Sequence, residues 1–435
     1  GDWSSDVCSS DLTASTPQSF HGTLYNREGD RLGEMQTPLH ERIIEPQARL
    51  ILDSSELESL FSTMPWQGPA LLEVSGTADF ELMTKLVSPS GLVSNTNCVT
   101  ENVVHNVEGS DSDAQTYIRL INTGDTLIDN IRGELRDSVG NRIGSAGVII
   151  RSRLLAKEAV FLSRADLEGL FGAWSGDASL EITSSASDLK LLNLNFVNDE
   201  TFFNFSCFES SDSARVYLMT TSQSNNVSET HLINTSESPV TLTGSLYQRD
   251  GTQLGSADVS LGDAAIAPRG RLIISATDLE SRFDVLPWVG PALLETAGAD
   301  NLALMTKLTS PSGLVSNTNC VRSGDVHNIE GSESSVVTYV RFINQGDEAI
   351  SGLTGTLYDS NGAILGAEHS ALLSELGSKQ AAWLTRSDLA EIFGDWEGEA
   401  SLLVDADDLP DLKLLNLNFV NGETFFNFSC YEQVR

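Results

Sequence analysis

The nine residues at positions 66–74 read WQGPALLEV, and their pattern occurs four times in the chain. The other copies are WSGDASLEI at 174–182, WVGPALLET at 288–296 and WEGEASLLV at 396–404. All four share the order Trp-x-Gly-x-Ala-x-Leu. Self-similarity at a regular spacing indicates that one structural unit is copied along the chain, so the sequence is best divided into repeats first.

Two longer matches show how the copies are grouped. LMTKLVSPSGLVSNTNCV begins at Leu82 and LMTKLTSPSGLVSNTNCV at Leu304, which gives an offset of 304 − 82 = 222. LLNLNFVNDETFFNFSC begins at Leu191 and LLNLNFVNGETFFNFSC at Leu414, which gives an offset of 414 − 191 = 223. A block of roughly 220 residues therefore occurs twice, and each block has two related halves. We predict four repeats, at residues 13–101, 102–210, 211–323 and 324–435.

Each repeat carries the same local structural signals. Before each Trp pattern stands a short helix signal, in which Asp, Ser or Thr precedes an Asp or Glu by three residues, as in a capping box. The four copies read DSSELESLF, SRADLEGLF, SATDLESRF and TRSDLAEIF. Earlier in each repeat, turn residues with a glycine lie between apolar flanks, which predicts a β-hairpin. These copies read LYNREGDRLG, LRDSVGNRIG, LYQRDGTQLG and LYDSNGAILG.

The second repeat shows the strand pattern in full. Its β-type segments are VHNVEGS, TYIRLIN, IDNIRGELRD, RIGSAGVII, AVFLS, ASLEITS, LKLLNLNFVN and TFFNFSCFE. Seven or eight short strands in about 110 residues are typical of an antiparallel β-sandwich. The long helical crossovers that a parallel sheet needs are missing from the sequence. The predicted fold class is all-β, with four tandem antiparallel β-sandwich domains that each contain one short helix.

The first twelve residues, GDWSSDVCSSDL, stand apart from the repeats. With the offset of 222, residues 13–25 align with residues 235–247, but the strand-like SETHLIN at 228–234 has no counterpart before residue 13. Back-translated, the segment resembles a widely used sequencing adapter. We interpret residues 1–12 as an assembly artefact; the alternative is a divergent natural N-terminus. The first repeat is then truncated, lacks its first strand and is expected to be the least stable.

The charge balance excludes several classes of function. The chain has 61 acidic and 26 basic residues, which gives a net charge of −35. Such a field repels nucleic acid and anionic membranes, so we expect no nucleic-acid partner. No apolar run approaches the ~18 residues that span a bilayer, so we expect no membrane insertion in this part of the protein.

Hydrolase, phosphate-loop, zinc-protease and dinucleotide motifs are missing as well, and we expect neither catalysis nor a cofactor or metal.

The repeat length and strand pattern resemble the immunoglobulin-like and fibronectin-like β-sandwich repeats of bacterial secreted and surface proteins. The resemblance covers residues 13–435 as an architecture, although the Cys…Trp…Cys spacing of true immunoglobulin domains is missing. It implies a spacer, adhesive or binding role outside the cytoplasm. We expect a location that is extracellular or on the cell surface.

Each repeat contains one tryptophan and one cysteine at equivalent places. The tryptophans Trp66, Trp174, Trp288 and Trp396 are expected to be structural, sealing the core beneath the short helix. The alternative is a platform on which sugars stack. The cysteines, Cys98, Cys207, Cys320 and Cys430, are expected to be buried free thiols if the repeats follow one another by simple translation. If neighbouring repeats fold back, Cys98 would meet Cys207 and Cys320 would meet Cys430.

Amide side chains form the one candidate ligand face. In LKLLNLNFVN, asparagine alternates with leucine, which suggests a strand with one apolar face and one amide-bearing face exposed to solvent. Such amides, together with phenylalanines, could line a sugar-binding surface. The residues concerned are Asn193, Asn195, Asn204, Phe203, Asn416, Asn418, Asn427 and Phe426. His105 and His327 also recur, in VHNVEGS and VHNIEGS, where a polar linker contact is favoured over a metal site.

The sequence supports two functions. The first is a non-enzymatic extracellular repeat protein that acts as a spacer, structural or adhesive array. The alternative is an accessory carbohydrate- or ligand-binding module of a larger secreted enzyme. The partners would be a polysaccharide or another surface protein.

Overall fold

The computed structural model forms two compact units. Unit 1 comprises Gly1–Cys207 together with Tyr431–Arg435, and unit 2 comprises Phe208–Cys430. Unit 1 thus holds the first and second repeats, and unit 2 holds most of the third and fourth. The structure describes residues 6–11, 16–41, 43–77, 79–87, 93–96, 98–184, 186–197, 201–206, 208–211, 215–298, 301–405, 409–420 and 424–434.

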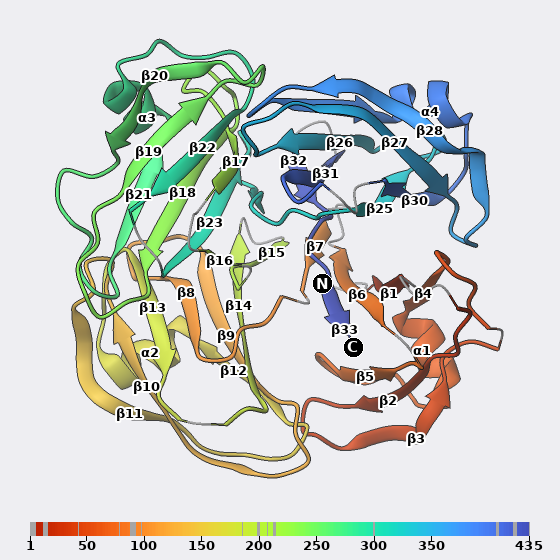
Figure 1. The fold of residues 1–435 in the computed structure, drawn as a ribbon. Helices are drawn as coiled ribbons and strands as arrows, with labels where there is room; N and C mark the ends of the chain where they lie inside the picture. Colours follow the sequence, from red (N-terminus) through yellow and green to blue (C-terminus); the bar gives the residue numbers. More distant parts are fainter. Residues whose placement is uncertain are drawn as a thin grey trace. The chain divides into compact units, whose positions relative to one another are not determined.

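The third repeat forms two antiparallel sheets in unit 2 (Figure 1). In chain order it contains β16 (Glu209–Ser211), β17 (Arg215–Met219), β18 (Val227–Asn234), β19 (Thr243–Tyr247), β20 (Gln253–Ser260), β21 (Arg271–Ser275), α3 (Ala276–Phe283), β22 (Ala292–Ala297), β23 (Leu302–Thr309) and β24 (Val315–Asn317). One sheet has the order β17-β22-β19-β20. The other has the order β16-β23-β18-β21, and β24 also pairs with β23.

The fourth repeat, also in unit 2, has the same two-sheet plan. It contains β25 (Asp325–Glu330), β26 (Val337–Asn344), β27 (Ile350–Tyr358), β28 (Ile364–Leu376), β29 (Ala381–Thr385), α4 (Arg386–Phe393), β30 (Glu399–Val404), β31 (Leu412–Val420) and β32 (Thr424–Asn427). The sheets have the orders β25-β30-β27-β28 and β29-β26-β31-β32. All pairings are antiparallel, which confirms the all-β prediction for this part of the chain.

The second repeat, in unit 1, repeats this arrangement strand for strand. It contains β8 (Val103–Glu108), β9 (Gln115–Asn122), β10 (Ile128–Arg136), β11 (Arg142–Leu154), β12 (Ala159–Ser163), α2 (Arg164–Phe171), β13 (Asp177–Ile182), β14 (Leu189–Val197) and β15 (Thr201–Asn204). Its sheets have the orders β11-β10-β13-β8 and β12-β9-β14-β15. All eight β-type segments predicted from its sequence are strands.

The first repeat differs from the other three. It contains β1 (Asp6–Asp11), β2 (His21–Tyr25), β3 (Arg31–Pro38), β4 (Arg49–Asp53), α1 (Ser54–Leu60), β5 (Leu71–Ser75), β6 (Phe80–Val87) and β7 (Val93–Asn95). In the described part of this repeat, one sheet has three strands, in the order β3-β2-β5. The other joins β1, β4, β6 and β7 with β33 (Glu432–Val434), which pairs with β6.

Strand β1 corrects one expectation about the first repeat. It pairs with β4 and β6 in the register that β18 has with β21 and β23, with Ser9 opposite Ile51 as His231 lies opposite Ile273. The place of SETHLIN is therefore filled, even though these residues lack apolar alternation, because the unpaired backbone groups of β4 and β6 need partners. Of the segment interpreted as an artefact, residues 1–5 and 12 lie outside the described residues. Among the described residues of the first repeat, the strand without a counterpart is the one that would precede β1 and correspond to β17.

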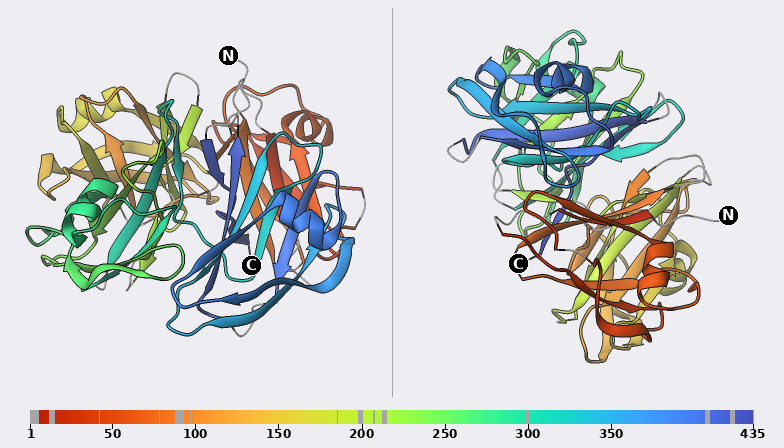
Figure 2. Two further views of the ribbon diagram at one scale, coloured as in Figure 1. Left: turned by 90° about the horizontal axis from the view of Figure 1, so that it is seen from above. Right: turned by 90° about the vertical axis from the view of Figure 1, so that its right-hand side faces the viewer.

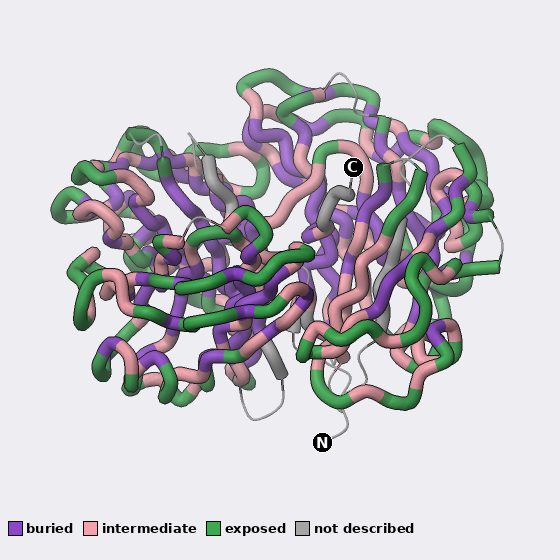
Figure 3. The backbone as a smooth tube through the Cα atoms, turned by 90° about the horizontal axis from the view of Figure 1, so that it is seen from below, coloured by how far each residue is buried: buried purple, intermediate pink, exposed green. Residues whose placement is uncertain are grey.

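Four hydrophobic clusters contain most of the buried apolar side chains, and each draws its residues from the two sheets of one repeat. In the third repeat, Val216 and Leu294 from one sheet meet Leu232 and Leu304 from the other. Buried residues follow the strands, and exposed residues follow the turns and sheet edges (Figure 3). A fifth cluster joins the third repeat to the fourth within unit 2, through Tyr217, Leu218, Leu293, Leu308, Ile343, Ala381, Leu415 and Leu417.

The four helices begin where the sequence predicts. Asp53, Ser163, Ser275 and Thr385 are the N-caps, and each makes both hydrogen bonds of a capping box with an acidic residue three positions later. Each helix lies beside the strands of its own repeat, as α1 does in the red to orange part of Figure 2. No helix in the described ranges is long and apolar enough to cross a membrane.

The predicted hairpins are also confirmed. They join β2 to β3, β10 to β11, β19 to β20 and β27 to β28. The turn glycines, at 29, 140, 251 and 362, have φ between 79° and 86°, the left-handed region that glycine adopts without a steric cost. Asp359 shows the turn chemistry, since its Oδ1 accepts hydrogen bonds of 2.8 Å from the backbone N–H groups of Asn361 and Ala363.

Candidate functional site

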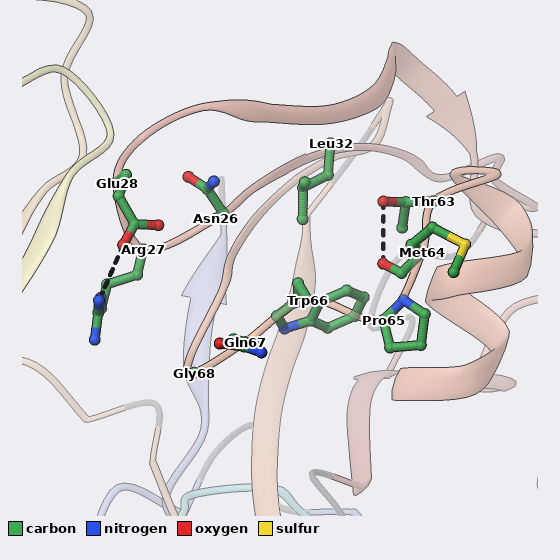
Figure 4. Close-up of a pocket in the computed structure, with 10 residues that line it drawn as sticks. All are labelled: Asn26, Arg27, Glu28, Leu32, Thr63, Met64, Pro65, Trp66, Gln67 and Gly68. Atoms are coloured by element: carbon green, nitrogen blue, oxygen red, sulfur yellow. Dashed lines mark hydrogen bonds and ion pairs between the residues drawn. The ribbon is translucent and has the colours of Figure 1, made fainter.

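A cavity of about 630 Å³ opens in the first repeat beside Trp66 (Figure 4). The hairpin turn after β2 supplies Asn26, Arg27 and Glu28, and the loop between α1 and β5 supplies residues 63–68. Trp66 forms an aromatic wall, and Gln67 and Asn26 offer amide groups nearby. The lining therefore combines an aromatic ring with a few polar groups, which is the composition of many small-ligand sites.

The turn that carries the polar side of the cavity is held by its own hydrogen bonds. The Oδ1 atom of Asn26 accepts a hydrogen bond of 2.8 Å from the backbone N–H of Asp30. Gly29 has a φ of 86°, which lets the chain reverse between β2 and β3. Arg27 and Glu28 form an ion pair with 3.0 Å between Nη2 and Oε1, and about half of each side chain is exposed. Water screens such a pair, so it contributes little to stability.

Trp66 differs from the three tryptophans at equivalent positions. Trp174, Trp288 and Trp396 are only 6%, 4% and 5% exposed and lie in the core clusters of their repeats. Those three side chains therefore offer no platform to a sugar. Trp66 is half-buried and packs at the margin of its core cluster.

The reason for the difference is the strand that covers the indole. In the second repeat Trp174 Nε1 donates a hydrogen bond to the carbonyl of Val107 in β8, and in the third Trp288 Nε1 donates to Met219 in β17, both at 3.3 Å. Within the described part of the first repeat, no strand takes the place of β8 or β17. The cavity at Trp66 therefore lies where the other repeats have a strand over the indole.

The expectation of an exposed amide face is wrong. Asn193, Asn195, Asn416 and Asn418 are 0% exposed, and both faces of β14 and β31 are buried. Asn193 Nδ2 donates hydrogen bonds to the carbonyls of His105 and Asn106, at 2.6 and 3.1 Å, and Asn195 Nδ2 donates to Asn106 at 3.3 Å. The polar groups that would have met a sugar are directed at the protein's own backbone.

A break in the opposite strand explains why these amides are buried. Asn106 has a φ of 56°, and the pairing of β8 with β13 shifts register beside it. Carbonyls that leave a β-ladder need other donors, and buried amides supply them. The fourth repeat has the same arrangement, with Asn328 at a φ of 57° and its carbonyl accepting from Asn416 and Asn418.

The remaining residues of the predicted face are buried as well. Asn204 Nδ2 donates to the carbonyl of Cys98 and Asn427 Nδ2 to that of Cys320, both at 3.0 Å. Phe203 and Phe426 are buried, and their rings lie about 6 Å from those of Phe205 and Phe428. The two asparagines join the end of one repeat to the end of the preceding one in the same unit.

A disulfide bond corrects the expectation of free thiols. Cys320 and Cys430 are bonded, with 5.4 Å between their Cα atoms, so the fold-back alternative applies to unit 2. Cys98 is also disulfide-bonded, whereas Cys207 lies outside the described residues. Free thiols were expected on the assumption that each repeat is related to the next by simple translation. This assumption is wrong for unit 2, because the cysteines of its two repeats lie within bonding distance.

The two repeated histidines are buried within their repeats. His105 Nδ1 lies 2.8 Å from Ser179 Oγ, and His327 Nδ1 lies 2.8 Å from Ser401 Oγ. The serine in each pair belongs to the strand beside the histidine, in β13 and β30. The favoured interpretation as a linker contact is therefore replaced by a contact between neighbouring strands of one sheet.

A buried lysine that the sequence motifs do not mark joins the repeats in each unit. Lys157 is buried, and its Nζ contacts a carboxylate oxygen of Glu73 in the first repeat and lies 3.1 Å from Asp125. Lys379 has the same place in unit 2, with Nζ 2.8 Å from Glu295 and 3.2 Å from Asp347. Both lysines have a left-handed backbone, with φ of 60° and 55°. Their matching positions in the two blocks, with an offset of 379 − 157 = 222, were the only signal in the sequence.

The carboxylates keep these lysines charged. Burial of the ammonium group lowers the pKa of Lys157, but the hydrogen bonds and charges of Glu73 and Asp125 outweigh it and raise the pKa above its ordinary value. Glu295 and Asp347 do the same for the pKa of Lys379. Each lysine also donates to a backbone carbonyl, that of Thr123 or Gln345, at 2.6 Å.

No protein-family model matches the chain, and no curated protein matches it.

Proposed function

We propose that the chain is a non-enzymatic extracellular array of four β-sandwich repeats, coupled in pairs and acting as a spacer, structural or adhesive element. The observation that carries the proposal is the duplicated joint between repeats. Lys157 with Glu73 and Lys379 with Glu295 make the same contact at equivalent positions of the two blocks. A spacer depends on stiff joints between its domains, and a large apolar contact such as the fifth cluster supplies stiffness in unit 2.

The disulfide bond supports a location outside the cytoplasm. Disulfides form and persist in oxidising compartments and are rare in reducing ones. The net charge of −35 fits this location, because mutual repulsion keeps a long array soluble and limits self-association.

The distribution of polar side chains supports a non-enzymatic role. The buried amides, the serine-bonded histidines and the joint lysines occur in two copies, and each copy is engaged in packing its own repeat or joint. An active site needs polar groups aimed at a substrate, usually once per chain.

A second candidate function rests on Trp66. It is the repeated tryptophan that is not fully buried, and its cavity brings Asn26 and Gln67 near the aromatic ring. An accessory carbohydrate-binding module would use this kind of surface. The ligand would then be a polysaccharide bound at the first repeat.

Glycan-array binding and calorimetry with the intact chain distinguish the two functions. For an array, we expect no saturable glycan binding and two cooperative unfolding transitions, one for each pair of repeats. For a binding module, saturable binding would be lost in Trp66→Ala and kept in Trp288→Phe, because Trp288 is buried. Saturable binding with that pattern, or four separate unfolding transitions, would contradict the array.

A further inference from the structure

The first repeat has a β-strand with an open edge. In the other repeats the equivalent strand pairs on both sides: β13 with β8 and β10, β22 with β17 and β19, and β30 with β25 and β27. Among the described strands, β5 pairs only with β2. An unpaired edge presents backbone N–H and C=O groups that can accept another strand.

The side chains along this edge lack the cover that their counterparts have. Trp66, Ala70 and Leu72 are all partly exposed. In the third repeat, Trp288, Ala292 and Leu294 are buried, and the apolar residues Val216 and Met219 of β17 share their core cluster. The missing contacts therefore correspond to one strand with apolar residues at its second and fifth positions.

A half-buried arginine in the second repeat points to the same strand. In unit 2, Arg341 is fully buried and its Nη1 donates a hydrogen bond to the carbonyl of Tyr217 in β17. Arg119 is its equivalent in unit 1, with its guanidinium 5.6 Å from the Phe161 ring as that of Arg341 lies 5.8 Å from Trp383. In the part of the chain described, Arg119 has no counterpart of this hydrogen bond, and its Nε, like the Nε of Arg341, has no hydrogen-bond partner. Desolvation lowers the pKa of Arg119 to about 10, since burial disfavours the charged form of the guanidinium.

Glu73 offers a charge for the same strand. Its equivalent in unit 2, Glu295, binds Lys379 on one side and Arg215, the first residue of β17, on the other, with 3.0 Å between Arg215 Nε and Glu295 Oε1. Among the described residues, Glu73 forms an ion pair with Lys157 and with no arginine. An arginine at the start of an added strand would complete the pair of contacts seen at Glu295.

We propose that the open edge of β5 is a strand-acceptor site for an extended segment of the Arg215–Met219 type, which enters from the N-terminal side of the first repeat in the same polypeptide. The offset of 222 places the equivalents of Arg215 and Met219 at 215 − 222 = −7 and 219 − 222 = −3, just before Gly1. The segment binds by β-augmentation, so its backbone pairs with β5. Its second and fifth residues cover Leu72 and Trp66. The backbone carbonyl of its third residue, the equivalent of Tyr217, accepts a hydrogen bond from Arg119.

Two fusion chains test the proposal. The first replaces residues 1–12 with residues 215–234, which supply both the β17 and β18 types of strand; the control carries residues 220–234, which supply only the second. We expect the first chain to raise the thermal midpoint of unit 1 by more than about 4 °C over the control, since about 2–4 °C accompanies each kcal/mol in proteins of this size. Trp66 should lose its quenching by acrylamide, measured as the difference between each chain and its Trp66→Phe variant.

The Arg119→Met variant tests the geometry. It should lower the midpoint more in the first fusion chain than in the control, because Arg119 gains its carbonyl partner only when the strand is present. Equal midpoints of the two fusion chains, or unchanged quenching of Trp66, would refute the acceptor site. Dimers of the first fusion chain in light scattering, with Trp66 shielded only in the dimer, would show that the strand comes from a second copy and would refute the proposed source.

Discussion

At the scale of single residues, one lysine in each unit ties two repeats together. Lys379 reaches from the fourth repeat to Glu295 of the third, and its ammonium group also binds the carbonyl of Gln345. The Tyr247 ring and the Asp347 carboxylate lie beside the same ammonium group. A charge-assisted hydrogen bond in a buried place contributes more than a surface ion pair, so we expect this lysine to matter for stability.

Lys379→Met should destabilise unit 2 by about 2 kcal/mol, the usual cost of losing a buried hydrogen bond to a charged group. Arg282→Met is the matched control, because its partner Asp263 is 94% exposed and the pair should contribute less than about 1 kcal/mol. Urea unfolding of both variants, monitored in unit 2, measures the difference. Equal losses in the two variants would show that the lysine does not join the repeats.

The residues of the candidate site show where sequence reasoning stops. The repeated Trp-x-Gly pattern locates four tryptophans, but it cannot show that Trp66, unlike the other three, has no covering strand among the residues described. The exposure of each tryptophan depends on the strand that covers its indole, such as β8 or β17, and this strand lies outside the Trp-x-Gly pattern. The asparagines of β14 were misjudged for a related reason: alternation predicts two faces, but the break at Asn106 that turns amides inward leaves no mark in the spacing.

At the scale of elements, the short helices depend on their caps. In α3, Ser275 Oγ accepts a hydrogen bond from the backbone N–H of Asp278, and Asp278 Oδ2 accepts one from the N–H of Ser275. Two hydrogen bonds lower the pKa of Asp278 below its ordinary value. The larger effect comes from the side chain of Ser275, and the smaller comes from the backbone N–H of Ser275. A helix of eight residues is marginal by itself, so these bonds and the packing of its buried face decide whether it forms.

Ser275→Ala should cost about 1 kcal/mol at pH 7, as other N-cap substitutions do. Because the pKa of Asp278 is lower in the folded state, its contribution is present above the unfolded pKa near 3.9 and is lost as the pH falls through the folded value. The cost of the variant should therefore shrink below about pH 4. Hydrogen exchange of residues 276–283 measures the effect, with the exposed Ser256→Ala as control; a cost that is independent of pH would contradict the role of Asp278.

Most elements could be predicted from sequence, because hairpin turns and strand periods are local. All eight strand segments of the second repeat were found in this way. The burial of both faces of β31 could not be predicted, since one face packs on the opposite sheet and the other on the third repeat through Leu415 and Leu417. That second contact is set by the pairing of repeats, which alternation along one strand does not encode.

At the scale of the whole molecule, the disulfide of unit 2 closes a long loop. Cys320 and Cys430 are 110 residues apart in sequence. A cross-link acts largely by restricting the unfolded chain, and the restriction grows with loop length. The sequence could not reveal the bond, because one cysteine per repeat is equally compatible with four free thiols.

Replacing the bond in Cys320→Ser/Cys430→Ser should destabilise unit 2 by about 5 kcal/mol, the value of the chain-entropy description for a loop of this length. Denaturation with and without a reductant measures it in the parent and in the variant. The parent should lose stability when reduced, whereas the transition of unit 2 in the variant should not respond to the reductant. A parent whose unit 2 transition is unaffected by reduction would show that the bond is not formed.

The cross-link between Cys320 and Cys430 also has a consequence for how such a gene can grow. Duplicating a stretch that encodes one repeat would leave an orphan thiol and half of a lysine joint, whereas duplicating two adjacent repeats copies every bond intact. A gene of this kind can therefore gain repeats only two at a time if the protein is to keep all of its bonds. The nearly identical stretches that alternate repeats share, such as those beginning at Leu82 and Leu304, are the record that such growth leaves in the sequence.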